Sequence, residues 1–165
     1  SIRVLSTAGP SESERKLAAA KPVNGKVDLN GWNLGSLEGL LPSTRVEALY
    51  ARGNGLRNLD GIPALPQLRI LDVSNNLLTD ILLPRCPLRM LHLTANYIDD
   101  VSIIPTIPTL EVLCVSNNRL TTLEGMRDQP ELRVCSAMFF VFLLFHSSCF
   151  HHTYAIRIVG LVCRR

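Results

Sequence analysis

Residues 68–78 read LRILDVSNNLL, and two later stretches repeat the same arrangement of apolar and polar residues. Residues 88–98 read LRMLHLTANYI, and residues 110–120 read LEVLCVSNNRL. Each stretch has the form L-x-x-L-x-L-x-x-N-x-L, in which the leucine positions also accept other apolar residues. The recurrence of several independent positions at fixed offsets predicts a repeated structural unit.

The same frame extends in both directions from this block. Residues 46–56 keep it with Asn54 at position nine, whereas the copy at residues 24–34 has Trp32 there, and Leu132 opens a sixth copy. First positions fall at residues 24, 46, 68, 88, 110 and 132, so the period is 22 residues with one unit of 20. Because the end units of solenoids diverge, Trp32 predicts a bulky ring that closes the core at this end.

Each copy contains the alternating pattern of a short strand, as at Leu71 and Val73. Such a strand cannot be stable alone, but stacked units align their strands into a parallel sheet and join their leucines into one core. At position nine the chain turns away from the strand, and an asparagine amide there can satisfy backbone groups of its own and the next repeat. These asparagines are expected to form a structural ladder: Asn54, Asn76, Asn96 and Asn118.

The second half of each unit carries the return path to the next strand. The spacing of Leu59, Ile62 and Leu65 fits one or two turns of α-helix or 3₁₀ helix. Prolines before each new strand stop longer helices and favour extended structure. They stand at Pro63, Pro66, Pro84, Pro87, Pro105, Pro108 and Pro130.

The repeated pattern is the leucine-rich-repeat signature. It predicts an α/β fold: a right-handed solenoid with short parallel strands on its concave face and 3₁₀ or short helical returns on its convex face. The predicted domain covers residues 24–137, about five and a half repeats. Residues 1–23 lack an apolar period and are rich in Ser, Ala and Lys, so they predict a flexible leader.

Residues 138–165 form an atypical tail, apolar at first and then basic. The chain up to Glu131 has 13 basic and 14 acidic residues, so its basic excess belongs to the remainder and predicts no nucleic-acid binding by the repeats. Residues 134–150 hold 13 apolar residues in 17, short of the about 20 that span a membrane. Three interpretations stay open: a substandard membrane anchor, a cap formed by residues 139–145, and the product of an altered reading frame.

The outward positions of the strands predict a partner-binding surface. Position three forms an apolar row of Ala48, Ile70, Met90, Val112 and Val134. Polar columns flank this row, and exposed apolar surface with a polar rim is typical of protein-binding faces; strand propensity alone is the alternative reason for such residues. The predicted binding residues are Tyr50, Arg52, Ile70, Asp72, Met90, His92, Val112 and Cys114, with Tyr50 and Arg52 as the main anchors.

Catalytic and metal-binding alternatives find less support in the sequence. Asp72, His92 and Cys114 succeed one another in column five, but nothing around them supplies an oxyanion hole or excludes water. The five cysteines include no C-x-x-C pair, and the spacing of His146, Cys149, His151 and His152 matches no common zinc site. We therefore expect no catalytic residues, no metal and no cofactor.

The runs at residues 68–78 and 110–120, with the turns LDGI (59–62) and LEGM (123–126), resemble the 22-residue class of leucine-rich repeats. That class is typified by regulatory subunit 7 of protein phosphatase 1 and includes dynein light chain 1 and the A′ protein of the U2 small nuclear ribonucleoprotein. The order LDGIP followed by LRILDVS is also similar to the leucine-rich block of a large microtubule-associated family. The resemblance implies a binding scaffold without catalytic activity.

Together these observations predict a non-enzymatic, protein-binding scaffold that is cytoplasmic and associated with the cytoskeleton. A regulatory subunit of a protein phosphatase and a ribonucleoprotein assembly factor are the alternatives, with a nuclear location as the alternative compartment. The chain is expected to be a monomer or a fragment of a longer protein, because it begins with Ser1 rather than Met. No secretory signal is found at its N-terminus, which agrees with the expected cytoplasmic location.

Overall fold

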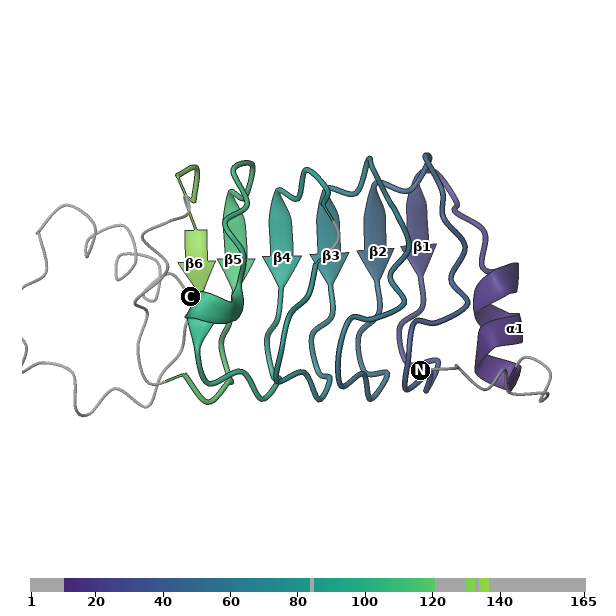
Figure 1. Cartoon of the computed structure of the whole chain (residues 1–165), viewed down its shortest axis with the longest axis horizontal. Coiled ribbons are helices and arrows are strands. Elements are labelled where there is room, and N and C mark those ends of the chain that lie inside the picture. Colours follow the sequence, from purple (N-terminus) through teal and green to yellow (C-terminus); the bar gives the residue numbers. More distant parts are fainter. Residues whose placement is uncertain (1–10, 84, 121–129, 133, 137–165) are drawn as a thin grey trace, which may run out of the picture.

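The structure is a computed structural model that describes residues 11–83, 85–120, 130–132 and 134–136. A single α-helix, α1 (Glu12–Ala19), precedes the strands of these described residues. The strands are β1 (Lys26–Asp28), β2 (Ala48–Tyr50), β3 (Ile70–Asp72), β4 (Met90–His92), β5 (Val112–Cys114) and β6 (Val134–Ser136), and a 3₁₀ turn, η1 (Val101–Ile103), lies between β4 and β5. Figure 1 shows the strands side by side along the molecule, with α1 against the β1 end.

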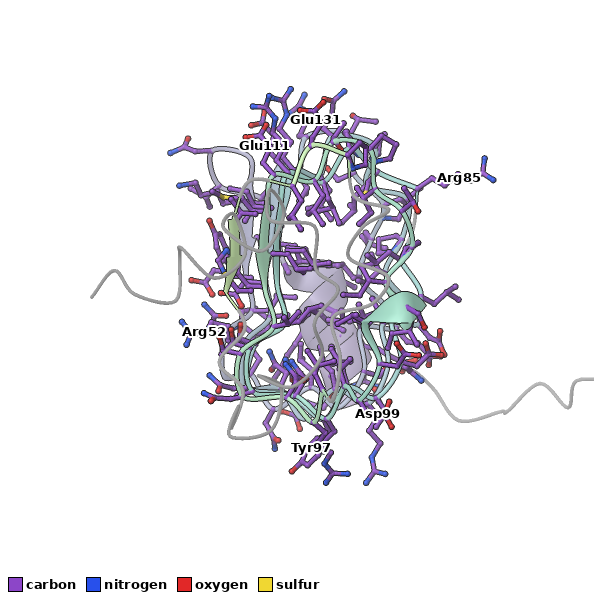
Figure 2. All side chains as sticks on the ribbon, turned by 90° about the vertical axis from the view of Figure 1, so that its left-hand side faces the viewer. Arg52, Arg85, Tyr97, Asp99, Glu111 and Glu131 are labelled. Atoms are coloured by element: carbon purple, nitrogen blue, oxygen red, sulfur yellow. The ribbon has the colours of Figure 1, made fainter. Side chains whose placement is uncertain are left out.

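The strands form one parallel sheet in the order in which they occur in the chain. Leu49 pairs with Leu71, Leu71 with Leu91, and Leu91 with Leu113, so the same position of each repeat lies above its predecessor. The chain crosses back to the start of each new strand on one side of the sheet: these returns lie in front of the strands in Figure 1 and to the right of them in Figure 2. The predicted solenoid, with strands on one face and returns on the other, is confirmed.

The core is a continuous column of aliphatic side chains between the strands and the returns. Leu49, Leu71, Leu91 and Leu113 are fully buried, and the apolar residues at positions one, six and eleven of the middle repeats pack around them. No single unit could enclose these side chains, because each needs the neighbouring unit to cover it. The solenoid is therefore stabilised by contacts between successive repeats.

The returns contain less helix than expected. Within the described residues only η1 is helical among them; the others are turns and extended segments closed by single backbone bonds, such as Ile62 N–H to the carbonyl of Leu59. Asp100 caps η1 by accepting a hydrogen bond from Ser102 N–H at 2.8 Å. Prolines at Pro63 and Pro66 lack the N–H groups that a second helical turn would need, which is why this return stays extended.

The segment that begins the described chain is a helix rather than part of a flexible leader, which corrects the expectation for residues 12–19; residues 1–10 lie outside the described part. Ser11 caps α1 by accepting a hydrogen bond from Glu14 N–H, and the Glu14 carboxylate accepts one from Ser11 N–H. This second bond lowers the pKa of Glu14. Leu17 is fully buried against the first repeat. A single buried apolar side chain produces no periodic pattern, so the sequence does not reveal this helix.

The end of the core is closed by α1 and not by Trp32, contrary to the prediction. The Trp32 side chain is 39% exposed and takes no part in the core, whereas Leu17 from α1 does. Gly39 allows the close approach, because a Cβ atom at this position would lie 3.0 Å from the Cα of Glu14. The helix thus occupies the place that a preceding repeat would take.

No helix within the described residues is long and apolar enough to cross a membrane. The proposed anchor at residues 134–150 overlaps this part of the chain only at β6, and the proposed cap at residues 139–145 lies outside it.

Candidate functional site

The register of the parallel strands brings the predicted binding residues together on one surface. Ile70, Met90 and Val112 are successive partners across β3, β4 and β5, and so are Asp72, His92 and Cys114. Figure 2 views the solenoid along its length and shows Arg52 on the strand side, opposite Arg85 on the return side. We use the term strand face for the outward-pointing residues Tyr50, Arg52, Ile70, Asp72, Met90, His92, Val112 and Cys114.

An apolar row runs across the middle of the strand face. Met90 is 37% exposed, and Ile70 and Val112 on either side of it are half-buried. The row does not extend to β2 as expected, because Ala48 is only 2% exposed. In the sheet, Ala48 stands between Lys26 and Ile70, whose side chains are both longer than its methyl group. The side chain of Val134 lies outside the described part of the structure.

Arg52 and Asp72 form a loose ion pair beside the apolar row. Nε of Arg52 lies 3.9 Å from Oδ2 of Asp72, and Oδ1 of Asp72 accepts a hydrogen bond from Ser74 N–H at 3.0 Å. The arginine side chain is 53% exposed and the carboxylate side chain only 14%. An exposed pair of this length contributes little to stability. The pair therefore leaves the guanidinium group of Arg52 at the surface, where a partner can reach it.

The Asp72–His92–Cys114 column has the wrong electrostatics for a nucleophilic thiol. Burial raises the pKa of the Cys114 thiol, and the negative charge of Asp72 raises it further. The thiolate is the reactive form of cysteine, so this environment disfavours it. In the described part of the chain the carboxylate of Asp72 bonds to Ser74 and pairs with Arg52 rather than orienting His92. The three side chains are neighbours without the contacts of a catalytic triad.

The asparagines at position nine connect each repeat to the one before it, not to the next one as the sequence analysis expected. Nδ2 of Asn76 donates to the carbonyls of Val73 in its own repeat and Ala51 in the preceding repeat, at 2.8 and 3.0 Å. Its Oδ1 accepts from the N–H groups of Asn54 and Leu56, both at 3.0 Å. The same inter-repeat bonds recur at Asn54, Asn96 and Asn118.

Position eight adopts a left-handed backbone conformation in each of the five units whose turn the structure describes, a feature that was not predicted from the sequence. The φ angles there are 69° and 65° at Gly31 and Gly53, and 56° at Asn75, Ala95 and Asn117. Glycine and asparagine are the residues that tolerate this conformation best. Their presence at position eight in four of the five units was the available signal. The turn after each strand is therefore fixed by the backbone as well as by the amide ladder.

A second group of exposed side chains, also missed, lies at position ten, beyond the asparagine turns. Leu77 is 39% exposed and Tyr97 37% exposed, and the guanidinium group of Arg119 stacks 4.5 Å from the centre of the Tyr97 ring. Figure 2 shows Tyr97 at the edge of the solenoid, away from Glu111 at the opposite edge. At that opposite edge Arg89 pairs with Glu111 at 3.2 Å.

No cluster of His, Cys, Asp and Glu in the described residues could hold a metal ion. The candidate ligands His146, Cys149, His151 and His152 lie outside that part of the chain.

Comparison with known proteins agrees with the fold. Residues 44–85 match the family model described as leucine-rich repeats (2 copies). No curated protein matches the chain. Domains of leucine-rich repeats are generally protein-interaction scaffolds, and solenoids use their extended concave faces for this purpose. The matched residues span β2 and β3, and the same parallel pairing continues through the neighbouring strands, so the described repeats form a parallel-strand solenoid of the kind that leucine-rich repeats build.

Proposed function

We propose that this chain is a non-enzymatic interaction module that binds a protein partner through the strand face. The observation that carries the proposal is the apolar row Ile70–Met90–Val112, exposed at Met90 and half-buried at its two ends. The sheet register places this row beside the polar column Asp72–His92–Cys114. A surface with an apolar centre and a polar rim provides the two components of a protein interface. The row is fixed by backbone pairing, so little conformational entropy is lost when a partner binds.

Tyr50 and Arg52 are the proposed anchors of the interface. They project from the strand face beside the apolar row, with Tyr50 half-buried and Arg52 exposed. Aromatic and arginine side chains dominate binding hot spots because they combine a large contact area with directional polar groups. The loose pairing with Asp72, 3.9 Å from Nε, leaves the guanidinium group of Arg52 exposed and able to turn toward a partner.

The proposed setting is the cytoplasm, and the proposed partner class is cytoskeletal. This rests on the resemblance of the repeats to the leucine-rich block of a microtubule-associated family. The catalytic subunit of a protein phosphatase is the second partner to test, because the 22-residue repeat class includes a phosphatase regulator. A nucleic acid is a poor fit, because residues 1–131 have 13 basic and 14 acidic side chains.

The test compares the full chain with two double variants. Tyr50→Ala with Arg52→Ala removes the proposed anchors, and Tyr97→Ala with Arg119→Ala removes a similar pair from a different edge. Co-sedimentation with microtubules and capture of the phosphatase catalytic subunit are measured separately. We expect the first variant to weaken binding at least about 30-fold and the control to change it less than about threefold. Equal binding by all three proteins would refute the strand face as the binding site.

A further inference from the structure

The first unit begins with Asn24, at a position that is buried in the units that follow. In the next four units this position holds an aliphatic residue that is at most 3% exposed: Val46, Leu68, Leu88 and Leu110. Asn24 instead lies at the surface in a tight turn, with φ angles of 50° at Asn24 and 73° at Gly25. Two backbone hydrogen bonds between Val23 and Lys26, of 2.8 and 3.0 Å, close the turn. Asn-Gly is the preferred pair for such a turn, so the start of the stack exposes an Asn-Gly step.

An asparagine that is followed by glycine can lose its side-chain amide without an enzyme. The backbone nitrogen of the glycine attacks Cγ of the asparagine. A new N–C bond closes an imide ring, the Cγ–Nδ2 bond breaks, and ammonia leaves with the proton of the attacking N–H group. Water then opens the ring at either carbonyl to give aspartate or isoaspartate. Glycine favours the attack because it has no Cβ atom to crowd the ring, and the reaction requires that the two groups can approach each other.

The structure restrains both reacting groups at a second Asn-Gly step. The chain has three such steps, at residues 24–25, 30–31 and 54–55. At the second, Gly31 N–H donates a hydrogen bond to the carbonyl of Arg52 at 2.8 Å. Oδ1 of Asn30 accepts a hydrogen bond from Arg52 N–H, also at 2.8 Å. The attacking nitrogen and the side chain that it would attack are therefore both held by the next repeat.

The third Asn-Gly step is protected by burial and by the asparagine ladder. Asn54 is fully buried, and its Nδ2 donates to the carbonyls of Leu29 and Arg52 at 2.8 and 3.3 Å. Rotation of the side chain toward Gly55 would break these hydrogen bonds in a site from which water is excluded. An unpaired polar group in such a site is costly, so the amide stays in place.

We propose that Asn24 is the site at which this chain deamidates. Within the part of the chain that the structure describes, neither the Asn24 side-chain amide nor Gly25 N–H makes a hydrogen bond. The remaining restraint is the turn itself, which lies beside β1 at the end of the sheet. Val23 in this turn is 70% exposed. Exposed turns at the end of a structure open locally at a lower cost than buried ones, which allows the side chain to reach the glycine nitrogen.

Deamidation at this step changes the contact between the first two repeats. The carbonyl of Gly25 accepts hydrogen bonds from Glu47 N–H and Ala48 N–H at 2.7 and 3.0 Å. Isoaspartate at position 24 lengthens the main chain by a methylene group immediately before this carbonyl. Both products also add a negative charge to the turn that contacts Glu47, whose Cγ lies 3.5 Å from the Cβ position of Gly25. The reaction therefore weakens the attachment of the turn to the start of β2.

The experiment incubates the full chain in a mildly alkaline buffer and follows it by peptide mapping that separates asparagine, aspartate and isoaspartate. In the folded protein we expect deamidation at Asn24 to be at least about tenfold faster than at Asn30 or Asn54. In concentrated urea the protecting hydrogen bonds are lost, and the three rates should lie within about threefold of one another. Equal rates at the three steps of the folded protein, or a faster reaction at Asn30 or Asn54, would overturn the proposal.

Two serine variants connect the reaction to its structural effect. Asn24→Ser should remove the early product, and the matched control Asn30→Ser should leave the rate at Asn24 unchanged. After incubation, hydrogen exchange at Ala48 N–H should be faster in the wild-type protein and in the control, but not in Asn24→Ser, while β4 stays unchanged in all three. An early product that persists in Asn24→Ser would assign the reaction to another residue.

Discussion

In the repeats that begin at residues 46, 68, 88 and 110, an asparagine bonds to the turn of the preceding unit, whereas the unit that begins at residue 24 has Trp32 at that position. Each amide serves the unit on its N-terminal side. The first unit has no repeat there, so an amide at position 32 would have no turn to serve. Its neighbour is α1, a helix, which has no strand-ending turn of the kind that the asparagine amides bond to. A departure from the repeat pattern thus marks where the stack begins.

The largest loss of stability is expected when an asparagine side chain is removed from the middle of the ladder. Asn76→Ala leaves the N–H groups of Asn54 and Leu56 and the carbonyl of Ala51 without this partner in a buried turn. We expect the free energy of unfolding to fall by about 4 kcal/mol, measured by urea denaturation. The exposed Asn58→Ala should lose less than about 1 kcal/mol. If Trp32→Asn stabilised the protein by more than about 1 kcal/mol, our distinction between the first unit and the others would be wrong.

The next effect tests the close packing of successive returns. At Gly61 a Cβ atom would lie 2.6 Å from the backbone nitrogen of Glu38, and φ is +86°. Gly61→Ala should destabilise the protein by about 3 kcal/mol, through both overlap and backbone strain. Gly35 also has a positive φ, +71°, but nothing lies within 4 Å of its Cβ position. Gly35→Ala should therefore lose only about 1 kcal/mol, and equal losses in thermal unfolding would exclude a packing role for Gly61.

A smaller loss is expected at the helix that closes the stack. Leu17→Ala removes the buried side chain of α1 and should lower the free energy of unfolding by about 2 kcal/mol. The effect is at the low end for such a change, because a terminal helix can shift to reduce the void. Lys16→Ala, at the exposed neighbouring position, serves as the control. Hydrogen exchange should show faster exchange in α1 and β1 of the leucine variant, while β4 stays unchanged.

The smallest expected effect is a gain in stability rather than a loss. Ala95 holds a left-handed conformation, φ 56°, where the other units use glycine or asparagine. Ala95→Gly should raise the free energy of unfolding by about 0.5–1 kcal/mol, because it relieves the contact between Cβ and the following carbonyl. Thermal unfolding is sensitive enough to detect this. A loss of stability would mean that packing of the Ala95 methyl group outweighs the backbone strain.

The sheet could be predicted from the sequence because the buried residues of its strands recur at a regular spacing. Leu71, Leu91 and Leu113 recur at the same position of each unit, and a shift of one residue would turn all of them outward. Helix α1 could not be predicted in this way, since its stability rests on the Ser11–Glu14 cap and one buried leucine. The burial of Ala48 depends on its neighbours across the sheet, which a column of aligned residues does not show.

The sequence predicted which residues of the strand face point outward. It did not predict the interactions and pKa shifts of those residues. Alternation places Tyr50, Asp72, His92 and Cys114 on one side of the strands, and the register agrees. The ion pair between Arg52 and Asp72 and the raised pKa of Cys114 depend on distances and burial that only coordinates provide. The identity of a partner follows from neither, because a repeat pattern specifies a surface rather than a ligand.

The unit at residues 68–87 is two residues shorter than the others, yet Ile70 still pairs with Met90 as Ala48 pairs with Ile70. The deficit is absorbed behind the sheet, where Leu82 is 71% exposed. The return segment of this unit therefore tolerates a change of length, whereas the strand must keep its length and register. A peptide tag or fluorophore inserted beside Leu82 should leave the opposite surface undisturbed, which gives such a solenoid room to evolve without losing its alignment.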